Sequence, residues 1–209
     1  MITVHHLNNS RSQRILWLCE ELHLDYTIKA YTRDAVTNLA PPELKQIHVL
    51  GKSPVIDDGD LRLSESGAIV DYIIRVHGGP GRLAPSPHSR SHEIYLEWLH
   101  FAEGSAMLPF LLRLYTSRLG EAGAPLKPRI DEQTASYLDY FEACLGDHDW
   151  LVDNTLSGAD IMMSFIAEIA IAQGQARPRL TAYVQRIQSR AAWQAAAAKS
   201  APYAFTLPG

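Results

Sequence analysis

The sequence predicts an α/β unit followed by an all-helical unit, and three observations predict this division. Over about the first 77 residues, apolar patterns typical of strands and of helices alternate. Residues 77–87 hold three glycines and three prolines, a composition typical of a domain boundary. After this stretch, every apolar pattern is helical. We therefore expect two domains, at residues 1–78 and 89–209.

The first unit is expected to have the element order βαβαββα. Its first helix carries apolar residues at helical spacing, among them Ile15, Leu18 and Leu22. The Asp58-Gly59 pair predicts the turn of a hairpin. The expected elements, in order, are a strand at 2–7, a turn at 8–10, a helix from 11, a strand at 25–31, a short helix or irregular segment at 41–48, a hairpin at 53–63 and a helix at 66–76.

The second unit is expected to be a bundle of helices. A long helix at 89–117 contains Pro109, which we expect to kink it because proline lacks a backbone N–H and crowds the preceding turn. Ser157 and Asp160 have the spacing of a capping box, which marks a helix start. The other helices are expected at 128–145, from 157 onward, at 178–188 and at 190–199, with irregular structure from 200.

The composition is that of an ordinary globular protein and excludes some functions. The net charge is −4 and no block of Lys or Arg occurs, which argues against a chain whose main role is to bind nucleic acid. The start of the chain has no basic or secretory segment, and the most apolar stretch, 161–172, is too short to span a bilayer. We expect a cytoplasmic protein whose two cysteines, Cys19 and Cys144, are reduced and buried.

The first candidate site segment, residues 9–14, follows the first strand and opens the first helix. A helix start carries free N–H groups and the positive end of the helix dipole, which together stabilise a thiolate. The hydroxyl of Ser10 could add one hydrogen bond to such a sulfur anion. Alternatively, Ser10 is only an N-cap, with Gln13 completing a capping box.

Two further segments also place backbone groups where they could bind a ligand. In 51–55, a cis Pro54 would turn the N–H and C=O of Ser53 outward to pair with a bound peptide, whereas a trans proline would simply enter an edge strand. In 63–69, Ser66 at a helix start could hold a carboxylate and Glu65 an ammonium group, with ordinary capping as the alternative. Each signal is weak alone, but the three occur in order within one βαβαββα unit.

The chain resembles the cytosolic glutathione transferase family along nearly its whole length. Residues 9–14 and 16–22 resemble the serine-type members, bacterial and fungal ones especially. Residues 50–56 resemble the cis-proline motif of the family, residues 64–69 its γ-glutamyl motif, and residues 157–160 its capping motif in the second domain. The resemblance implies a thioredoxin-like first domain, an all-α second domain and glutathione as co-substrate, with no metal.

The resemblance also implies a role for each site residue. Ser10 would hold the glutathione sulfur as thiolate, although a neighbour, Asn9 or Ser12, is an alternative contact. Lys52 would lie near the glycyl carboxylate, the Ser53 backbone before Pro54 would pair with the cysteinyl backbone, and Glu65 and Ser66 would hold the γ-glutamyl end. Ser53 departs from the family, which usually has an apolar residue there. The absence of a Tyr in the first turn, and of a Cys after the first strand, disfavours tyrosine-type and cysteine-type members.

The expected activity is conjugation of glutathione to a hydrophobic electrophile, or reduction of a peroxide. Met107, Leu111 and Tyr115 belong to an apolar band that is mostly core or interface, but they could line a co-substrate pocket. Family resemblance implies a homodimer that uses the 89–117 helix and the 60–76 region, in which Glu103 would reach a ligand of the neighbouring subunit or remain an exposed charge. Alternatives are an isomerase of the maleylacetoacetate type, whose Ser-Ser-Cys pattern is missing, and a non-catalytic binding or regulatory protein. The adjacent His5 and His6 point to opposite faces of a strand and make a poor metal pair.

Overall fold

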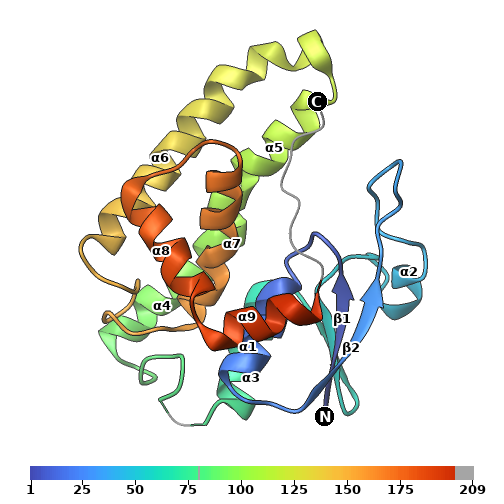
Figure 1. Cartoon of the computed structure of the whole chain (residues 1–209), viewed down its shortest axis with the longest axis vertical. Coiled ribbons are helices and arrows are strands. Elements are labelled where there is room, and N and C mark those ends of the chain that lie inside the picture. The colour runs from blue at the N-terminus through green and yellow to red at the C-terminus, as the bar shows by residue number, and fades with distance from the viewer. Residues whose placement is uncertain (80, 201–209) are drawn as a thin grey trace. The chain divides into compact units, whose positions relative to one another are not determined.

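The computed structural model describes residues 1–79 and 81–200, which form two compact units (Figure 1). The first unit comprises residues 1–83 together with the described part of the chain from 188 onward, and the second comprises residues 84–187. The sequence-based domains, 1–78 and 89–209, remain a proposal about the organisation of the chain. The irregular tail expected from 200 lies, beyond Ser200, outside the described residues.

A four-stranded mixed sheet forms the centre of the first unit. Its strands are β1 (Ile2–Leu7), β2 (Tyr26–Tyr31), β3 (Val55–Asp58) and β4 (Leu61–Ser64), in the order β2-β1-β3-β4. β1 runs parallel to β2 and antiparallel to β3, which forms the expected hairpin with β4. At the hairpin turn Gly59 has φ +57°, a conformation that glycine adopts without strain. This is the expected thioredoxin-like arrangement.

Three helices of the first unit follow the predicted order. They are α1 (Gln13–Glu21), α2 (Leu44–Ile47) and α3 (Ser66–His77). α1 begins two residues later than its predicted start at 11, because the turn and bend that follow β1 extend over residues 8–12. Seven consecutive residues of α1, from Gln13 to Cys19, are buried, so this helix is covered on more than one face.

A helix from the far end of the chain packs against α1. This is α9 (Ala191–Lys199), and it belongs to the first compact unit although it follows the second in sequence. Arg190 pairs with Glu21, Lys199 with Glu20, and the Ser200 hydroxyl with the side chain of Gln13. The sequence predicts this helix but does not predict that it packs against α1.

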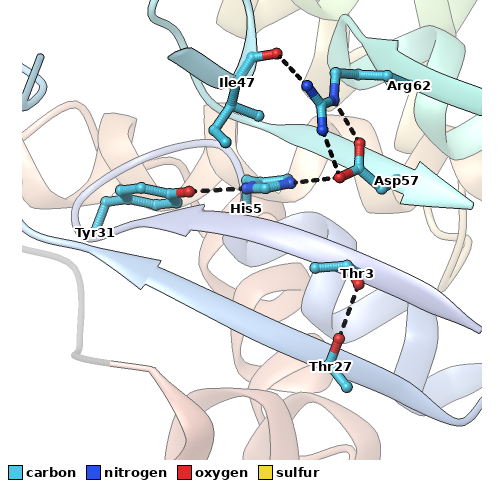
Figure 2. A network of polar contacts seen from close by, with 7 residues as sticks. All are labelled: Thr3, His5, Thr27, Tyr31, Ile47, Asp57 and Arg62. Atoms are coloured by element: carbon cyan, nitrogen blue, oxygen red, sulfur yellow. Dashed lines mark hydrogen bonds and ion pairs between the residues drawn. The ribbon is translucent and has the colours of Figure 1, made fainter. Parts of the chain in front are cut away.

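A polar network ties the sheet to α2 (Figure 2). His5 on β1 bonds through Nδ1 to the Tyr31 hydroxyl and through Nε2 to an Asp57 oxygen, each at 3.0 Å. Arg62 on β4 donates two hydrogen bonds to Asp57, at 2.6 and 2.8 Å, and one to the Ile47 carbonyl at 2.8 Å. The hydrogen bond from Arg62, supported by His5, lowers the pKa of Asp57 to about 2. The network therefore anchors the segment that leads to Pro54.

The second unit is helical. Its elements are α4 (Arg90–Phe101), a π-helical turn η1 (Ala102–Ala106), α5 (Met107–Ser117), a 3₁₀ segment η2 (Gly120–Leu126), α6 (Lys127–Leu145), α7 (Gly158–Ala172) and α8 (Pro178–Gln188). The predicted single helix at 89–117 is thus interrupted, but just before Pro109 rather than at it. In η1 the Met107 N–H donates to the Ala102 carbonyl, one position wider than an α-helix. In a regular α-helical turn, the ring of Pro109 would clash with the Ser105 carbonyl. The wider π-helical turn avoids this clash.

α7 is the core helix of the second unit. Thirteen of its residues, from Gly158 to Ala170, are buried, as expected for a helix that is apolar all round. The predicted capping box is confirmed: the Ser157 side chain accepts from the Asp160 N–H, and an Asp160 oxygen accepts from the Ser157 N–H at 2.9 Å. Asp160 also accepts from Leu151 N–H at 3.1 Å and from the Tyr183 hydroxyl at 3.0 Å. Its complete burial nevertheless raises its pKa to about 6.

The two cysteines have different environments. Neither forms a disulfide; Cys19 is buried, and burial raises the pKa of its thiol to about 12. Cys144 is exposed, so the prediction that both thiols are buried is wrong for this residue. The buried face of α6 passes through Phe141 and Leu145, and Cys144 lies outside it. In the described part of the chain, no helix is both long and apolar enough to cross a membrane.

Candidate functional site

The three predicted segments meet at one edge of the sheet. Val55 pairs with His5 of β1 on one side and with Ser64 of β4 on the other. Pro54 therefore lies beside the end of β1, which leads to Ser10, and beside the end of β4, which leads to Glu65. The sheet register alone brings together parts of the chain that are far apart in sequence.

The turn after β1 is held by an arginine that the sequence does not single out. Arg33 donates through Nε to the Asn8 carbonyl and through Nη2 to the Asn9 carbonyl, each at 3.1 Å. Its backbone N–H donates to Asn8 Oδ1 at 2.7 Å. Asn9 adopts φ +50°, a region that Asn tolerates better than most residues. These bonds fix the backbone on which Ser10 is placed.

Ser10 does not cap α1. The N-cap position is Ser12, and its side chain makes no capping hydrogen bond. The capping box proposed as the alternative for Ser10 and Gln13 is therefore not formed. Instead, the Ser10 Oγ accepts from the Ser12 N–H at 3.2 Å, which holds the hydroxyl beside the first turn of α1. There the positive end of the helix dipole favours an anion, although the Gln13 N–H itself donates to the Ser10 carbonyl.

Ser10 is one member of a chain of hydrogen bonds. Its Oγ lies 2.7 Å from Ser12 Oγ, which lies 2.8 Å from His6 Nδ1. Ser12 Oγ also accepts from the Leu7 N–H at 3.2 Å. Burial lowers the pKa of His6 below its usual value, so its imidazole is neutral at pH 7. Sequence reasoning weighed His6 only as a metal ligand, because nothing in the sequence shows that a strand residue meets Ser12.

The cis peptide bond predicted at Pro54 is confirmed. The hydroxyl of the preceding Ser53 donates to the His5 carbonyl at 2.9 Å and lies 3.5 Å from Ser10 Oγ. The unusual Ser53 thus links β1 to the cis-proline segment.

The two residues before Ser53 differ in what they contribute. Lys52 is exposed. Gly51 has φ +58°, and a Cβ there would come within 2.7 Å of the Lys45 side chain, so the backbone requires glycine at this position.

The third segment opens α3. Glu65 is the N-cap residue, with φ 72° and ψ 118°, a sparsely populated region for any residue but glycine. No side chain of the described chain caps α3. Ser66, the first helical residue, is buried while Glu65 is exposed. A helix start left uncapped, next to a hydroxyl, is suited to bind a carboxylate.

The candidate residues of the second unit lie on or just before α5. Met107 is buried, Leu111 half-buried and Tyr115 exposed, and their spacing of four places them along one face of the helix. Glu103 lies in the π-helical turn. Over the described residues, no group of three or more His, Cys, Asp or Glu is arranged to hold a metal ion.

The thioredoxin-like sheet and its three loop segments, followed by a helical unit, define a class of two-domain glutathione-binding proteins. The family model of the glutathione S-transferase N-terminal domain matches residues 1–75, and that of the C-terminal domain matches residues 100–191. The chain belongs to the glutathione S-transferase family.

Individual relatives agree with this assignment. Glutathione S-transferase 1 of Saccharomyces cerevisiae is 33% identical over 199 residues, which cover 85% of this chain and 84% of that protein. Glutathione S-transferase 3 of Schizosaccharomyces pombe is 33% identical over 79% of this chain and 72% of its own. The crystal structure of a glutathione S-transferase from Actinobacillus pleuropneumoniae superposes with a TM-score of 0.88 at 34% identity, covering 97% of this chain and 94% of that one.

Proposed function

We propose that the protein is a glutathione transferase that binds glutathione as co-substrate and holds its sulfur as thiolate at Ser10. The observation that carries the proposal is the position of the Ser10 hydroxyl, beside the start of α1 and 3.5 Å from Ser53 Oγ in the cis-proline segment. A hydroxyl donor and a helix start both favour a thiolate over a thiol. The bound thiolate then attacks a co-substrate held next to it, so that catalysis rests on charge stabilisation and proximity.

The geometry supports Ser10 rather than Ser12 as the donor to sulfur. Ser12 is fully buried, and its Oγ already contacts Ser10, His6 and the Leu7 backbone. Asn9 supplies its carbonyl to Arg33 and is held in a tight turn. Ser10 Oγ also lies 3.5 Å from Ser53 Oγ, to which it donates, and a stronger acceptor such as a thiolate displaces that long contact.

The other contacts to glutathione follow from the three segments. The Ser53 backbone beside Pro54 pairs with the cysteinyl residue as a strand does. The exposed Lys52 binds the glycyl carboxylate, while Glu65 binds the γ-glutamyl ammonium group. Ser66 and the free N–H groups at the start of α3 hold the γ-glutamyl carboxylate.

The second substrate is a hydrophobic electrophile or a peroxide, which contacts Met107, Leu111 and Tyr115. The exposed Tyr115 and half-buried Leu111 present the apolar and hydroxyl-bearing surface that such a ligand needs. A detoxification role and a cytoplasmic location accompany this activity. Two cysteines that form no disulfide accord with a reducing compartment.

A homodimer forms part of the same proposal. The two regions expected to meet a partner, 60–76 and 89–117, each expose large apolar side chains. Leu61 and Val76 in the first region are 39% and 49% exposed, and Ile94 and Leu108 in the second are 47% and 45% exposed. Light scattering at micromolar concentration should give twice the chain mass of 23.3 kDa. If it does, Glu103→Gln should weaken glutathione binding, and unchanged binding would leave Glu103 as a surface charge.

The proposed activity is tested by retention on immobilised glutathione, followed by turnover with a panel of aromatic electrophiles and organic peroxides. Retention that free glutathione reverses, together with turnover of one substrate class, supports the proposal. Failure of both would overturn it. Retention without any turnover across the panel would instead favour a binding protein on the same fold.

A further inference from the structure

The hydrogen bonds around Ser10 form a single buried line that begins at His6. Along it, His6 Nδ1 lies 2.8 Å from Ser12 Oγ, and Ser12 Oγ lies 2.7 Å from Ser10 Oγ. His6, Ser12 and Ser10 are 5%, 0% and 5% exposed, so bulk water does not compete for these bonds. Each serine has only one hydroxyl proton, so the direction in which the line donates decides which group receives the proton of Ser10.

One direction satisfies every group. If His6 Nδ1–H donates to Ser12, the Ser12 Oγ accepts from His6 and from the Leu7 N–H. Its own proton then goes to Ser10 Oγ at 2.7 Å, in preference to the Leu7 carbonyl at 3.3 Å. Ser10 Oγ then accepts from both the hydroxyl and the N–H of Ser12, at 2.7 and 3.2 Å. Both lone pairs of Ser10 are occupied, and its proton can only point outward.

The far end of the line agrees with this direction. The hydroxyl of Ser53 donates to the His5 carbonyl at 2.9 Å, so it is an acceptor toward Ser10. The resulting contact of 3.5 Å is at the limit of a hydrogen bond, and the Ser10 proton is therefore only weakly held. In the opposite direction, Ser12 would donate to His6 and Ser10 would donate to Ser12 at 2.7 Å, leaving no proton for an anion.

We propose that His6 is a positioning residue whose Nδ1–H, relayed through Ser12, orients the Ser10 hydroxyl toward the glutathione sulfur. The inference rests on the proposed function and adds to it the reason why Ser10 is a donor. His6 touches neither the thiol nor the second substrate; it acts only through Ser12. A neutral imidazole with Nδ1 protonated is sufficient, and no net proton transfer is involved.

The test compares two variants of nearly the same shape, His6→Asn and His6→Leu. The Asn amide nitrogen is the same number of bonds from Cα as His Nδ1, so it restores a donor, whereas Leu has the same branching and no polar atom. The ultraviolet absorbance of bound thiolate gives the pKa of the glutathione thiol. We expect His6→Leu to raise that pKa by about one unit, a factor of about ten in thiolate at a pH below it. The kcat should fall with it while the KM for glutathione is unchanged, and His6→Asn should stay close to the unsubstituted protein.

The controls distinguish a failure of this inference from a failure of the proposed glutathione transferase function. His77→Leu alters a histidine at the last residue of α3, whose side chain bonds to Asp58 at 2.6 Å, and should leave the thiol pKa unchanged. Ser12→Ala removes the middle of the line with little change in volume, so it should reproduce the effect if His6→Leu does not fold. An unchanged thiol pKa in both His6→Leu and Ser12→Ala, or a His6→Asn protein as impaired as His6→Leu, would overturn the donor line. If the unsubstituted protein forms no bound thiolate, the proposed function itself fails, and this inference with it.

Discussion

Arg190 forms a two-pronged ion pair with Glu21, with Nε 2.5 Å from Oε1 and Nη2 2.8 Å from Oε2. The Glu21 side chain is only 8% exposed and also accepts from the Trp17 indole at 2.8 Å. This pair raises the pKa of Arg190 and ties the entry of α9 to the end of α1.

Breaking this pair should destabilise the first unit. We expect Glu21→Gln to lower the free energy of unfolding by about 1–2 kcal/mol, since a charge-assisted bidentate bond to a nearly buried carboxylate is lost. Urea unfolding measures this. The matched control is Glu132→Gln, whose partner Arg129 and own side chain are 64% and 69% exposed, and which should show no measurable change. Equal effects of the two substitutions would contradict a structural role for the Arg190–Glu21 pair.

Ser10→Ala should impair turnover far more than binding. Loss of one preorganised donor to a full charge typically lowers kcat by roughly 10²–10³. Because the start of α1 still stabilises the thiolate in this variant, we expect a decrease in kcat near the lower end of that range. Glutathione affinity should change only a few-fold, because the other segments still hold the tripeptide. Steady-state kinetics and calorimetry measure the two quantities. Unchanged kcat at neutral pH would remove Ser10 from the catalytic role.

Glu65 should lower the stability of the protein through its backbone conformation and strengthen glutathione binding through its carboxylate. Its φ of 72° costs a non-glycine residue about 1–3 kcal/mol, and glycine adopts it freely. After the extra chain entropy of glycine is subtracted, Glu65→Gly should raise the free energy of unfolding by about 1 kcal/mol. It should also weaken glutathione binding, because the carboxylate is lost.

Glu65→Ala separates these two effects. It removes the carboxylate but keeps the strain, so it should weaken binding equally without the gain in stability. Thermal unfolding and calorimetry on the pair provide the measurement. If both variants are stabilised alike, backbone strain at Glu65 is not the cause.

Asp160 should make the second unit sensitive to pH. Its pKa is about 6 when folded and near 3.9 in an unfolded chain, so the folded state binds the proton more tightly. The stability contributed by this group is therefore greatest below about pH 4 and declines as the pH rises to about 6. Asp160→Asn lacks this titration. The difference in unfolding free energy between the unsubstituted protein and this variant should be larger at pH 4 than at pH 7, and a constant difference would contradict the raised pKa.

Local patterns predicted most of the fold. The strand at 2–7 and the helix at 178–188 appear with the predicted bounds, because their periodicity and end signals lie within the segments themselves. The capping box at Ser157 and Asp160 is confirmed for the same reason. The π-helical turn was not predicted, since an extra residue in a helical turn leaves the apolar pattern nearly unchanged.

The candidate site shows where sequence reasoning stops. Ser10 and Pro54 could be singled out because each belongs to a short motif with a local geometry. His6 and Arg33 could not, because their partners are set by the register of β1 and β2 and by the turn after β1. The exposure of Cys144 depended similarly on which face of α6 is covered.

The place of α9 has a consequence for how the protein is made. A ribosome completes the strands and first three helices of the first unit well before it reaches residue 188. Roughly a hundred further residues must be added, which takes about 5–20 seconds at ordinary rates of synthesis. During that interval the surface of α1 that α9 will cover, including the side chains of Glu20 and Glu21, has no partner from the C-terminal helix. The first unit to emerge is therefore among the last to be finished, and a nascent chain halted after α8 would leave that surface open to chaperones.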